Sequence, residues 1–124
     1  MAGHPSIEVE TISPGDLFRE CALPPLIDYL SLDTEGSEWE IVDAIDFARY
    51  GFGLITVEHN FVADRRALIY ARLKALGYCR LSVRFDDWYW HPLNLDRLNG
   101  GVWVDFDGVV ASYRAGEGHG GEPA

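Results

Sequence analysis

Three apolar segments separated by two helical patterns constrain the fold of this 124-residue chain more than any other feature. Leu26–Asp33 and Leu54–Val57 are dense in large apolar residues, as expected for strands covered on both faces. Cys79–Phe85 follows as a third strand. The residues between these segments recur with the period of a helix. This order of elements predicts an α/β fold with a parallel sheet and right-handed crossovers.

Capping residues mark the two crossover helices. Ser37 with Glu40 three residues later is a capping box that opens the first of them. Asp64 is predicted to cap the second, Arg65–Leu76, and Gly77 to end it in a left-handed conformation. The apolar face of this second helix is expected to comprise Leu68, Ile69, Leu73 and Leu76.

Shorter elements are predicted before the first buried strand. Ile7–Ile12 alternates apolar and polar residues, which is typical of a half-exposed strand. Ser13 is a candidate cap for a short helix with Pro14 at its first position. Pro24-Pro25 stops that helix.

The last third of the chain has a weaker pattern. Asp86-Asp87 is predicted to form a turn and Trp88–Trp90 a short fourth strand. Val102–Phe106 and Val109–Tyr113 flank Asp107-Gly108, a good hairpin signal. We therefore expect one unit over residues 1–92, and a hairpin-like extension with a flexible tail over residues 93–124.

Polar side chains follow the first two buried strands. Asp33 and Glu35 come after one strand, and Glu58, His59 and Asn60 after the next. In open α/β sheets ligands bind beyond these carboxyl ends. Two facing carboxylates repel each other, which favours a shared cation, a shared proton or a basic partner. Two plainer interpretations stay open: Glu35 stabilises a helix dipole by about 0.3–1 kcal/mol, and His59 belongs to a solvated loop.

An aromatic cluster offers a second candidate region. Asp87–His91 contains three aromatic residues and a histidine. Core or edge packing is the commoner role of such clusters, and a wall of a substrate pocket is the alternative. Arg65 is most simply part of a solvated helix face, with contact to an anionic group as the alternative.

Composition and missing motifs narrow the function classes. Ten Lys and Arg against twenty Asp and Glu give a net charge of −10, which would repel nucleic acid. No apolar run approaches the ~20 residues of a membrane span, and the first residues lack a signal-peptide core. Cys21 and Cys79 lack CxxC spacing, so a reduced, cytoplasmic setting is expected. No GxGxxG motif opens a helix after a predicted strand, since the glycines at Gly118–Gly121 belong to the predicted tail, and no P-loop or GxSxG motif is present.

Taken together, the segments LSLDTEGSEWEI, ITVEHN and DDWYWHP resemble the FkbM-type methyltransferases, a branch of the class I S-adenosylmethionine-dependent enzymes. That family has Asp-x-Glu-Gly-Ser/Ala-Glu at the end of a central strand, then a helix, a strand ending in Glu-His, and a helix ending in Gly-Tyr. The resemblance covers about residues 7–92 and includes the lead-in VETISPGDLF. The matching residues are Asp33, Glu35, Gly36, Ser37, Glu38, Glu58, His59, Asn60, Gly77, Tyr78 and Asp87.

The resemblance implies a partial Rossmann-like methyltransferase sheet. Leu26–Asp33 and Leu54–Val57 would be its fourth and fifth strands, Cys79–Phe85 its sixth, and Trp88–Trp90 an antiparallel seventh. Ile7–Ile12 would be the preceding edge strand. The first strands, which carry the glycine-rich cofactor loop and an acid for the ribose, are expected to be missing.

The resemblance also implies chemistry for the polar strand ends. The intact enzyme would use S-adenosylmethionine to methylate a hydroxyl of a sugar or another small molecule. Related catechol-type enzymes hold a divalent cation at these two strand ends, which by analogy makes Asp33, Glu58 and Asn60 candidate metal ligands. The expected catalytic residues are Asp33, Glu58 and His59, and the expected substrate-binding residues are Glu35, Asn60, Asp87 and Trp88. No cofactor-binding residue is expected within these 124 residues.

Two hypotheses about function follow. In the first, the chain is the C-terminal part of a methyltransferase, inactive alone and completed by an N-terminal half. In the second, it is a non-catalytic remnant or a binding module that associates with itself through an exposed apolar strand edge. A small-molecule substrate is expected under the first hypothesis, and neither nucleic acid nor membrane is an expected partner.

Overall fold

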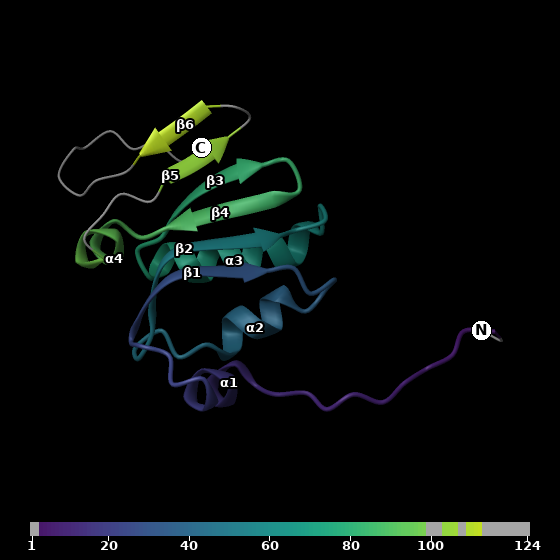
Figure 1. Ribbon diagram of the computed structural model, residues 1–124. Coiled ribbons are helices and arrows are strands. Elements are labelled where there is room, and N and C mark those ends of the chain that lie inside the picture. Colours follow the sequence, from purple (N-terminus) through teal and green to yellow (C-terminus); the bar gives the residue numbers. More distant parts are fainter. Residues whose placement is uncertain (1–2, 99–102, 107–108, 113–124) are drawn as a thin grey trace.

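The computed structural model describes residues 3–98, 103–106 and 109–112. Helices and strands follow one another along the chain as a mixed α/β arrangement (Figure 1). The helices are α1 (Pro14–Glu20), α2 (Glu38–Ala44), α3 (Ala63–Ala75) and α4 (Pro92–Arg97). The strands are β1 (Leu26–Leu32), β2 (Gly51–Glu58), β3 (Cys79–Val83), β4 (Asp86–Trp90), β5 (Trp103–Phe106) and β6 (Val109–Ser112).

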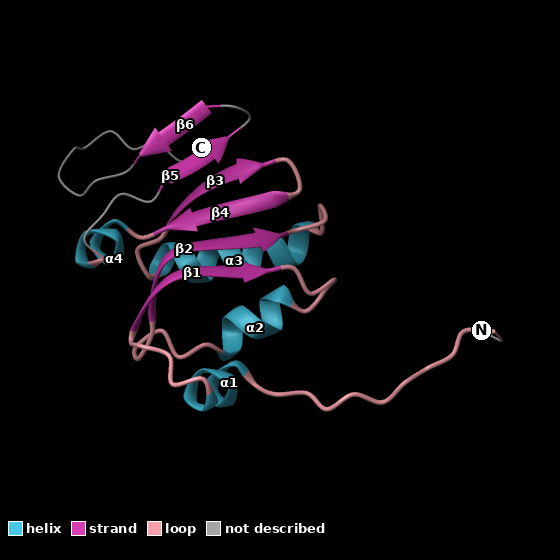
Figure 2. Cartoon of the chain, viewed as in Figure 1, coloured by secondary structure: helices cyan, strands magenta, loops and turns pink. Residues whose placement is uncertain are grey.

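Four of these strands form one sheet in the order β1-β2-β4-β3. β1 and β2 are parallel, whereas β4 is antiparallel to both of its neighbours, β2 and β3. The expectation of a parallel sheet, drawn from the order of elements, is therefore wrong for two of the three pairings. The resemblance correctly implied the reversed strand. Figure 2 shows α2 and α3 packed along the sheet, with α4 near the starts of β1 and β2.

The core is centred on β2, whose residues 52–57 are all buried. This strand has β1 on one side and β4 on the other, so its continuous apolar run matches its surroundings. β1 differs from the prediction, because Asp28, Tyr29 and Ser31 are exposed rather than covered. It is an edge strand of the described sheet, so one of its edges has no strand beside it there.

The helix boundaries depend on local hydrogen bonds. Ser13 caps α1 as predicted, since its Oγ accepts from the Asp16 N–H at 3.2 Å. The capping box at α2 is wrong. Ser37 occupies the N-cap, but within the described residues its side chain makes no capping bond, and it donates instead to Thr34 Oγ1. The Glu40 carboxylate turns away from the helix start to Arg65.

α3 begins two residues before the predicted boundary, with Val62 at the N-cap and Asp64 in the first turn. Leu68 is exposed, so the buried face rests mainly on Ile69 and Leu73. The end of the helix is as predicted. Gly77 has φ +95°, and the N–H groups of Gly77 and Tyr78 donate to the carbonyls of Lys74 and Leu73 in a Schellman motif.

The predicted strand Ile7–Ile12 does not form in the described part of the chain. Its residues are extended and exposed, with Ile7 at 84% and Val9 at 70%. A strand needs a hydrogen-bonded neighbour, and β1 pairs with β2 instead. Alternation of apolar and polar residues is therefore not sufficient to form a strand at Ile7–Ile12.

The hairpin between β3 and β4 turns at Arg84-Phe85 rather than at Asp86-Asp87. Arg84 takes a left-handed backbone with φ +53°, and both aspartates belong to β4. α4 is an element that the sequence analysis did not predict. Its signal is Pro92 at the first helical position, with His91 as the cap.

Beyond α4, β5 and β6 pair antiparallel. The predicted turn Asp107-Gly108 and the predicted tail lie outside the described residues. No helix in the described ranges is long and apolar enough to cross a membrane.

Candidate active site

Three carboxylates meet at the carboxyl ends of β1 and β2. Asp33, Glu35 and Glu58 each place one oxygen so that all three lie within 4.8 Å of one another. The parallel register, with Leu32 beside Val57, brings the residues after β1 next to the end of β2. Asp33 and Glu35 are exposed and Glu58 is half-buried. The predicted convergence of these strand ends is therefore present.

The charge of this cluster changes the acidity of Glu58. A hydrogen bond with Asp33, with burial and repulsion from neighbouring carboxylates adding to it, raises the pKa of Glu58 to about 7. Near neutral pH the pair therefore shares a proton for part of the time. A carboxylate with such a pKa suits a general base that works at neutral pH.

The loop that carries Glu35 is held by a residue that the sequence analysis did not single out as functional. The Glu38 carboxylate is buried and accepts from the backbone N–H groups of Thr34 and Gly36, at 3.3 and 3.0 Å. Glu35 has φ +60° and Gly36 φ +127°, so the turn is tight. Arg65 donates to the Gly36 carbonyl at 2.9 Å and pairs with Glu40. This arginine therefore lies on a partly exposed helix face, and the anionic group that it contacts belongs to the chain itself.

His59 is buried under the rim rather than exposed in a solvated loop. Its Nδ1 accepts from the Phe61 N–H at 2.9 Å, and its Nε2 lies 3.0 Å from the Arg84 carbonyl. A carbonyl only accepts, so Nε2 carries the proton and the ring is neutral. The backbone N–H of His59 donates to the Phe85 carbonyl. Both ring nitrogens are therefore bonded to backbone groups of this chain.

The loop around His59 displays two phenylalanine rings. Phe61 and Phe85 are 65% and 57% exposed, and their centroids are 5.3 Å apart. Asn60, Phe61 and Arg84 all have positive φ, at 47°, 58° and 53°. Such backbone is costly for residues other than glycine, and it persists only where the surroundings enforce it. Asn60, a predicted ligand and substrate contact, lies exposed in this strained loop.

Asp87 and Trp88 lie within β4 and not at the acidic cluster. Asp87 is only 1% exposed, and both of its oxygens accept from Arg66, at 2.7 and 2.8 Å. Arg66 also donates to Ser82 Oγ. This bidentate pair ties α3 to the hairpin. Trp88 is half-buried opposite Thr56 of β2.

The rim that carries the acidic cluster does not fit S-adenosylmethionine. The hollow beside Glu58 has a volume of only about 40 Å³ and is lined mainly by polar and charged side chains. Neither of the turns that follow β1 and β2 contains the run of glycines with which backbone N–H groups cradle a nucleotide cofactor. Three clustered carboxylates do fit a hard divalent cation, whose preferred ligands are oxygens.

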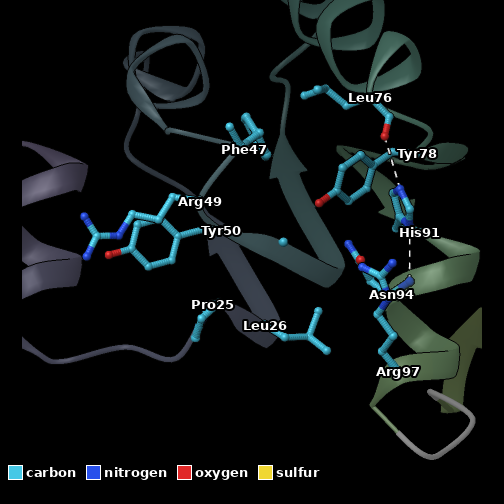
Figure 3. A pocket seen from close by; sticks show the side chains of 12 residues that line it. Pro25, Leu26, Phe47, Arg49, Tyr50, Leu76, Tyr78, His91, Asn94 and Arg97 are labelled. Atoms are coloured by element: carbon cyan, nitrogen blue, oxygen red, sulfur yellow. Dashed lines mark hydrogen bonds between the residues drawn. The ribbon is translucent and has the colours of Figure 1, made fainter.

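A larger cavity, of about 330 Å³, lies at the opposite end of the same two strands (Figure 3). Leu26 and Gly51, the first residues of β1 and β2, line it together with residues of α4. The sequence analysis did not predict this cavity, since its walls come from four separate chain segments.

Comparison with known families tests the resemblance to the FkbM-type methyltransferases. The family model for the methyltransferase FkbM domain matches residues 2–89. The chain belongs to this family. The match spans all of the acidic cluster and its supporting loops, and it extends into β4. No curated protein and no solved structure matches the chain.

Within this FkbM domain, the family motif has two kinds of residue. Asp33, Glu35 and Glu58 gather at the rim, whereas Glu38, His59 and Asp87 are buried and bonded to the chain. Only burial separates the two kinds, and burial is not visible in a motif. The supporting role of Glu38 had one sequence signal, Gly36 two residues before it, because a glycine there marks a tight turn whose backbone N–H groups need an acceptor.

Proposed function

We propose that this FkbM domain forms the acceptor side of a methyltransferase that acts on a hydroxyl group of a small molecule. The observation that carries the proposal is the cluster of Asp33, Glu35 and Glu58, with the pKa of Glu58 raised to about 7. Membership of the family supports methyl transfer as the reaction class. S-adenosylmethionine is the expected methyl donor of the intact enzyme, bound by residues other than those described.

Glu58 is the proposed base. The hydroxyl of the acceptor donates a hydrogen bond to the Glu58 carboxylate. As this hydroxyl becomes a nucleophile, its proton moves to the carboxylate of Glu58. Asp33, within hydrogen-bond reach, stabilises the protonated form of Glu58 afterwards. Glu35 is the proposed contact for a second hydroxyl of the acceptor. His59 acts as a positioning residue, because its ring fixes the loop that follows Glu58.

The exposed pair Phe61 and Phe85 supports an acceptor with an apolar face. Glu58 is paired in register with Asp86, the residue after Phe85, so the rings and the carboxylates share one rim. A flat or apolar part of the acceptor would cover the rings while its hydroxyls reach the acids. Asp87 and Trp88, which lie inside β4, are not part of this proposal.

The strand order supports a place in a larger sheet. The order β1-β2-β4-β3, with β4 reversed, agrees with the fourth, fifth, seventh and sixth strands of a Rossmann-like methyltransferase. β1 then offers its open edge to the strands that bind the cofactor. We therefore infer that the chain works with an N-terminal half of an FkbM domain.

The test is a complementation assay. The full chain is mixed with a separately produced N-terminal half of an FkbM domain that has the glycine-rich loop, and with isotopically labelled S-adenosylmethionine and a panel of phenols, sugars and polyols. Label is expected in an acceptor only when both parts are present. Glu58→Gln should reduce transfer by about 100-fold, within the range of general base catalysis. Glu20→Gln on α1 is the matched control, and transfer at the wild-type rate by Glu58→Gln would refute the assignment.

A binding module that associates with itself is the second candidate function. The observation that favours it is the open edge of β1, beside which Tyr29 is 53% exposed. An open strand edge readily pairs with another chain. Association without any acceptor binding would favour this alternative.

A further inference from the structure

The larger cavity lies far from the acidic rim, at the amino ends of β1 and β2. Its walls come from the start of each strand, the turn before β2, the end of α3, and α4 (Figure 3). Its volume of about 330 Å³ is within the range of small-molecule sites. The proposed acceptor chemistry uses none of its residues.

Hydrogen bonds fix the walls of this cavity. The Phe52 N–H donates to the Tyr78 hydroxyl at 3.0 Å, and Asn94 Nδ2 donates to the Phe52 carbonyl at 3.0 Å. His91 Nε2 lies 3.1 Å from the Leu76 carbonyl. Gly51 leaves room for Asn94, because a Cβ there would lie 2.9 Å from Asn94 Nδ2. A cavity with fixed walls needs little ordering when a ligand binds.

The charge of the cavity contrasts with that of the chain. The chain carries a net charge of −10, and yet Arg49 and Arg97 both line this cavity. Three other arginines, Arg19, Arg65 and Arg66, form ion pairs with carboxylates. Among the residues that the structure describes, no carboxylate forms an ion pair with Arg49 or Arg97.

The guanidinium groups of Arg49 and Arg97 lie on different sides of the cavity. Arg49 lies over the Tyr50 ring, 5.6 Å from its centroid. In Figure 3 the Arg97 side chain rises from α4 beside Asn94. Asp46, the acid nearest to Arg49 in sequence, accepts from the backbone N–H of Ala48. Asp96, next to Arg97 in sequence, is exposed, and within the described residues it forms no ion pair with Arg97. The Arg97 side of the cavity is therefore suited to an anion.

The remaining walls are aromatic. Phe47, Tyr50 and Tyr78 line the cavity, and the ring of Tyr78 packs edge-on against His91 with centroids 4.9 Å apart. The proton of the His91 ring is used by the Leu76 carbonyl, and Asn94 Nδ2 donates to the Phe52 carbonyl. Arg97, which forms no ion pair within the described residues, is therefore the group that we assign to a ligand. Aromatic walls beside a guanidinium suit a planar ring that carries a negative charge.

We propose that this cavity binds a small aromatic carboxylate, with the carboxylate on Arg97 and the ring among Phe47, Tyr50 and Tyr78. The guanidinium offers two parallel N–H groups, which match the two oxygens of a carboxylate. The site is independent of the acidic rim, so its failure and that of the proposed function are separate results.

The test is titration of the full chain with benzoate, followed by amide and side-chain NMR. Shifts are expected at Gly51, His91 and Asn94, and not at Asp33 or Glu58. Arg97→Gln should weaken benzoate binding by about tenfold or more. Arg19→Gln on α1 removes the same charge from an exposed position outside the cavity, and it should leave the affinity unchanged. Circular dichroism establishes that both variants are folded.

Other ligands decide which part of the proposal holds. Benzamide, which has the same ring without the charge, should bind much more weakly than benzoate. Inorganic phosphate, which has charge without a ring, should also bind more weakly. Equal binding of benzamide would overturn the role of the anion, and equal binding of phosphate would overturn the role of the aromatic walls. Benzoate shifts that are absent, or unaffected by Arg97→Gln, would overturn the site.

Discussion

Two histidines of this FkbM domain stabilise loops by the same arrangement of bonds. In His59 and His91 alike, Nδ1 accepts from a backbone N–H two or three residues later, and Nε2 faces a carbonyl from another element. Only the neutral ring can accept at one nitrogen while it donates at the other. A histidine in a family motif can therefore be essential without touching the reacting atoms.

This arrangement predicts that acid destabilises the fold through His91. Burial, with the charge of Arg97, lowers the pKa of His91 below its usual value of 6.5. The folded state thus prefers the neutral ring, and its contribution to stability is present above pH 6.5 and lost as the pH falls through the lowered pKa. Melting temperature measured against pH should fall on this acid side. His91→Gln should flatten the slope, whereas His4→Gln should not; an unchanged slope in His91→Gln would contradict the argument.

Glu58 should act with the opposite sign. Its pKa is raised from 4.5 to about 7, so the fold disfavours the ionised carboxylate. The contribution of the protonated group is present below pH 4.5 and lost as the pH rises through about 7. Glu58→Gln removes this loss. The melting temperature of the variant should exceed that of the wild type most clearly above pH 7, with Glu20→Gln as the control. A variant that is less stable than the wild type at alkaline pH would refute the prediction.

A divalent cation should relieve the same repulsion. If Asp33, Glu35 and Glu58 share a cation, Mg²⁺ or Mn²⁺ raises the melting temperature, and the increase grows with the logarithm of the cation concentration once the site is saturated. Asp33→Ala should abolish this effect, and Asp43→Ala, an exposed acid on α2, should not. The measurement is thermal unfolding with and without the cation. A cation effect that persists in Asp33→Ala would exclude the proposed ligands.

At the level of elements, residue patterns predicted the segments that are buried by many neighbours. The LITV run became the centre of β2, and the Leu73–Tyr78 end of α3 closed as predicted because Gly77 supplies the left-handed backbone. Patterns did less well where a side chain had competing partners. Ser37 and Glu40 have the spacing of a capping box, but Arg65, 25 residues from Glu40, takes the carboxylate.

The candidate site was predictable in part for the same reason. The carboxyl ends of two parallel strands must lie together, so Asp33 and Glu58 were expected to meet. Nothing local shows that Asp87 is buried, since its partner Arg66 is on another element. The Phe61–Phe85 pair joins two loops, and the walls of the cavity at the amino ends of β1 and β2 come from four chain segments. Such features depend on the tertiary fold.

The Gly77 turn provides a test at this scale. Its φ of +95° is unfavourable for any residue with a Cβ, and an added Cβ would lie 2.9 Å from His91 Nε2. Gly77→Ala should reduce the free energy of unfolding by about 1–2 kcal/mol. Gly15→Ala in α1, where the nearest atom would be a flexible arginine nitrogen at 3.5 Å, should be neutral or stabilising. Urea unfolding measures both, and equal effects would contradict the prediction.

For the whole molecule, the open edge of β1 determines how copies of the chain interact. We expect association that increases with concentration, because the strand has hydrogen-bonding groups without a neighbouring strand in the described sheet. Tyr29→Lys places a charge beside this edge and should shift the mass seen by light scattering towards the monomer. Leu93→Lys, at a position on α4 that is 62% exposed, is the control. A chain that is monomeric at every concentration would refute the prediction.

The position of β4 in the sequence also determines when the sheet can be completed during synthesis. β2 receives its first neighbour early, because β1 leaves the ribosome before it, but its other neighbour comprises Asp86–Trp90. β3 likewise has no partner in the described sheet until that last strand emerges. Until then, one side of the most apolar strand stays open to chaperones and to other nascent chains. A ribosome that stalls before residue 90 would thus hold a half-built sheet, and sensitivity to protease should end abruptly once this strand is released.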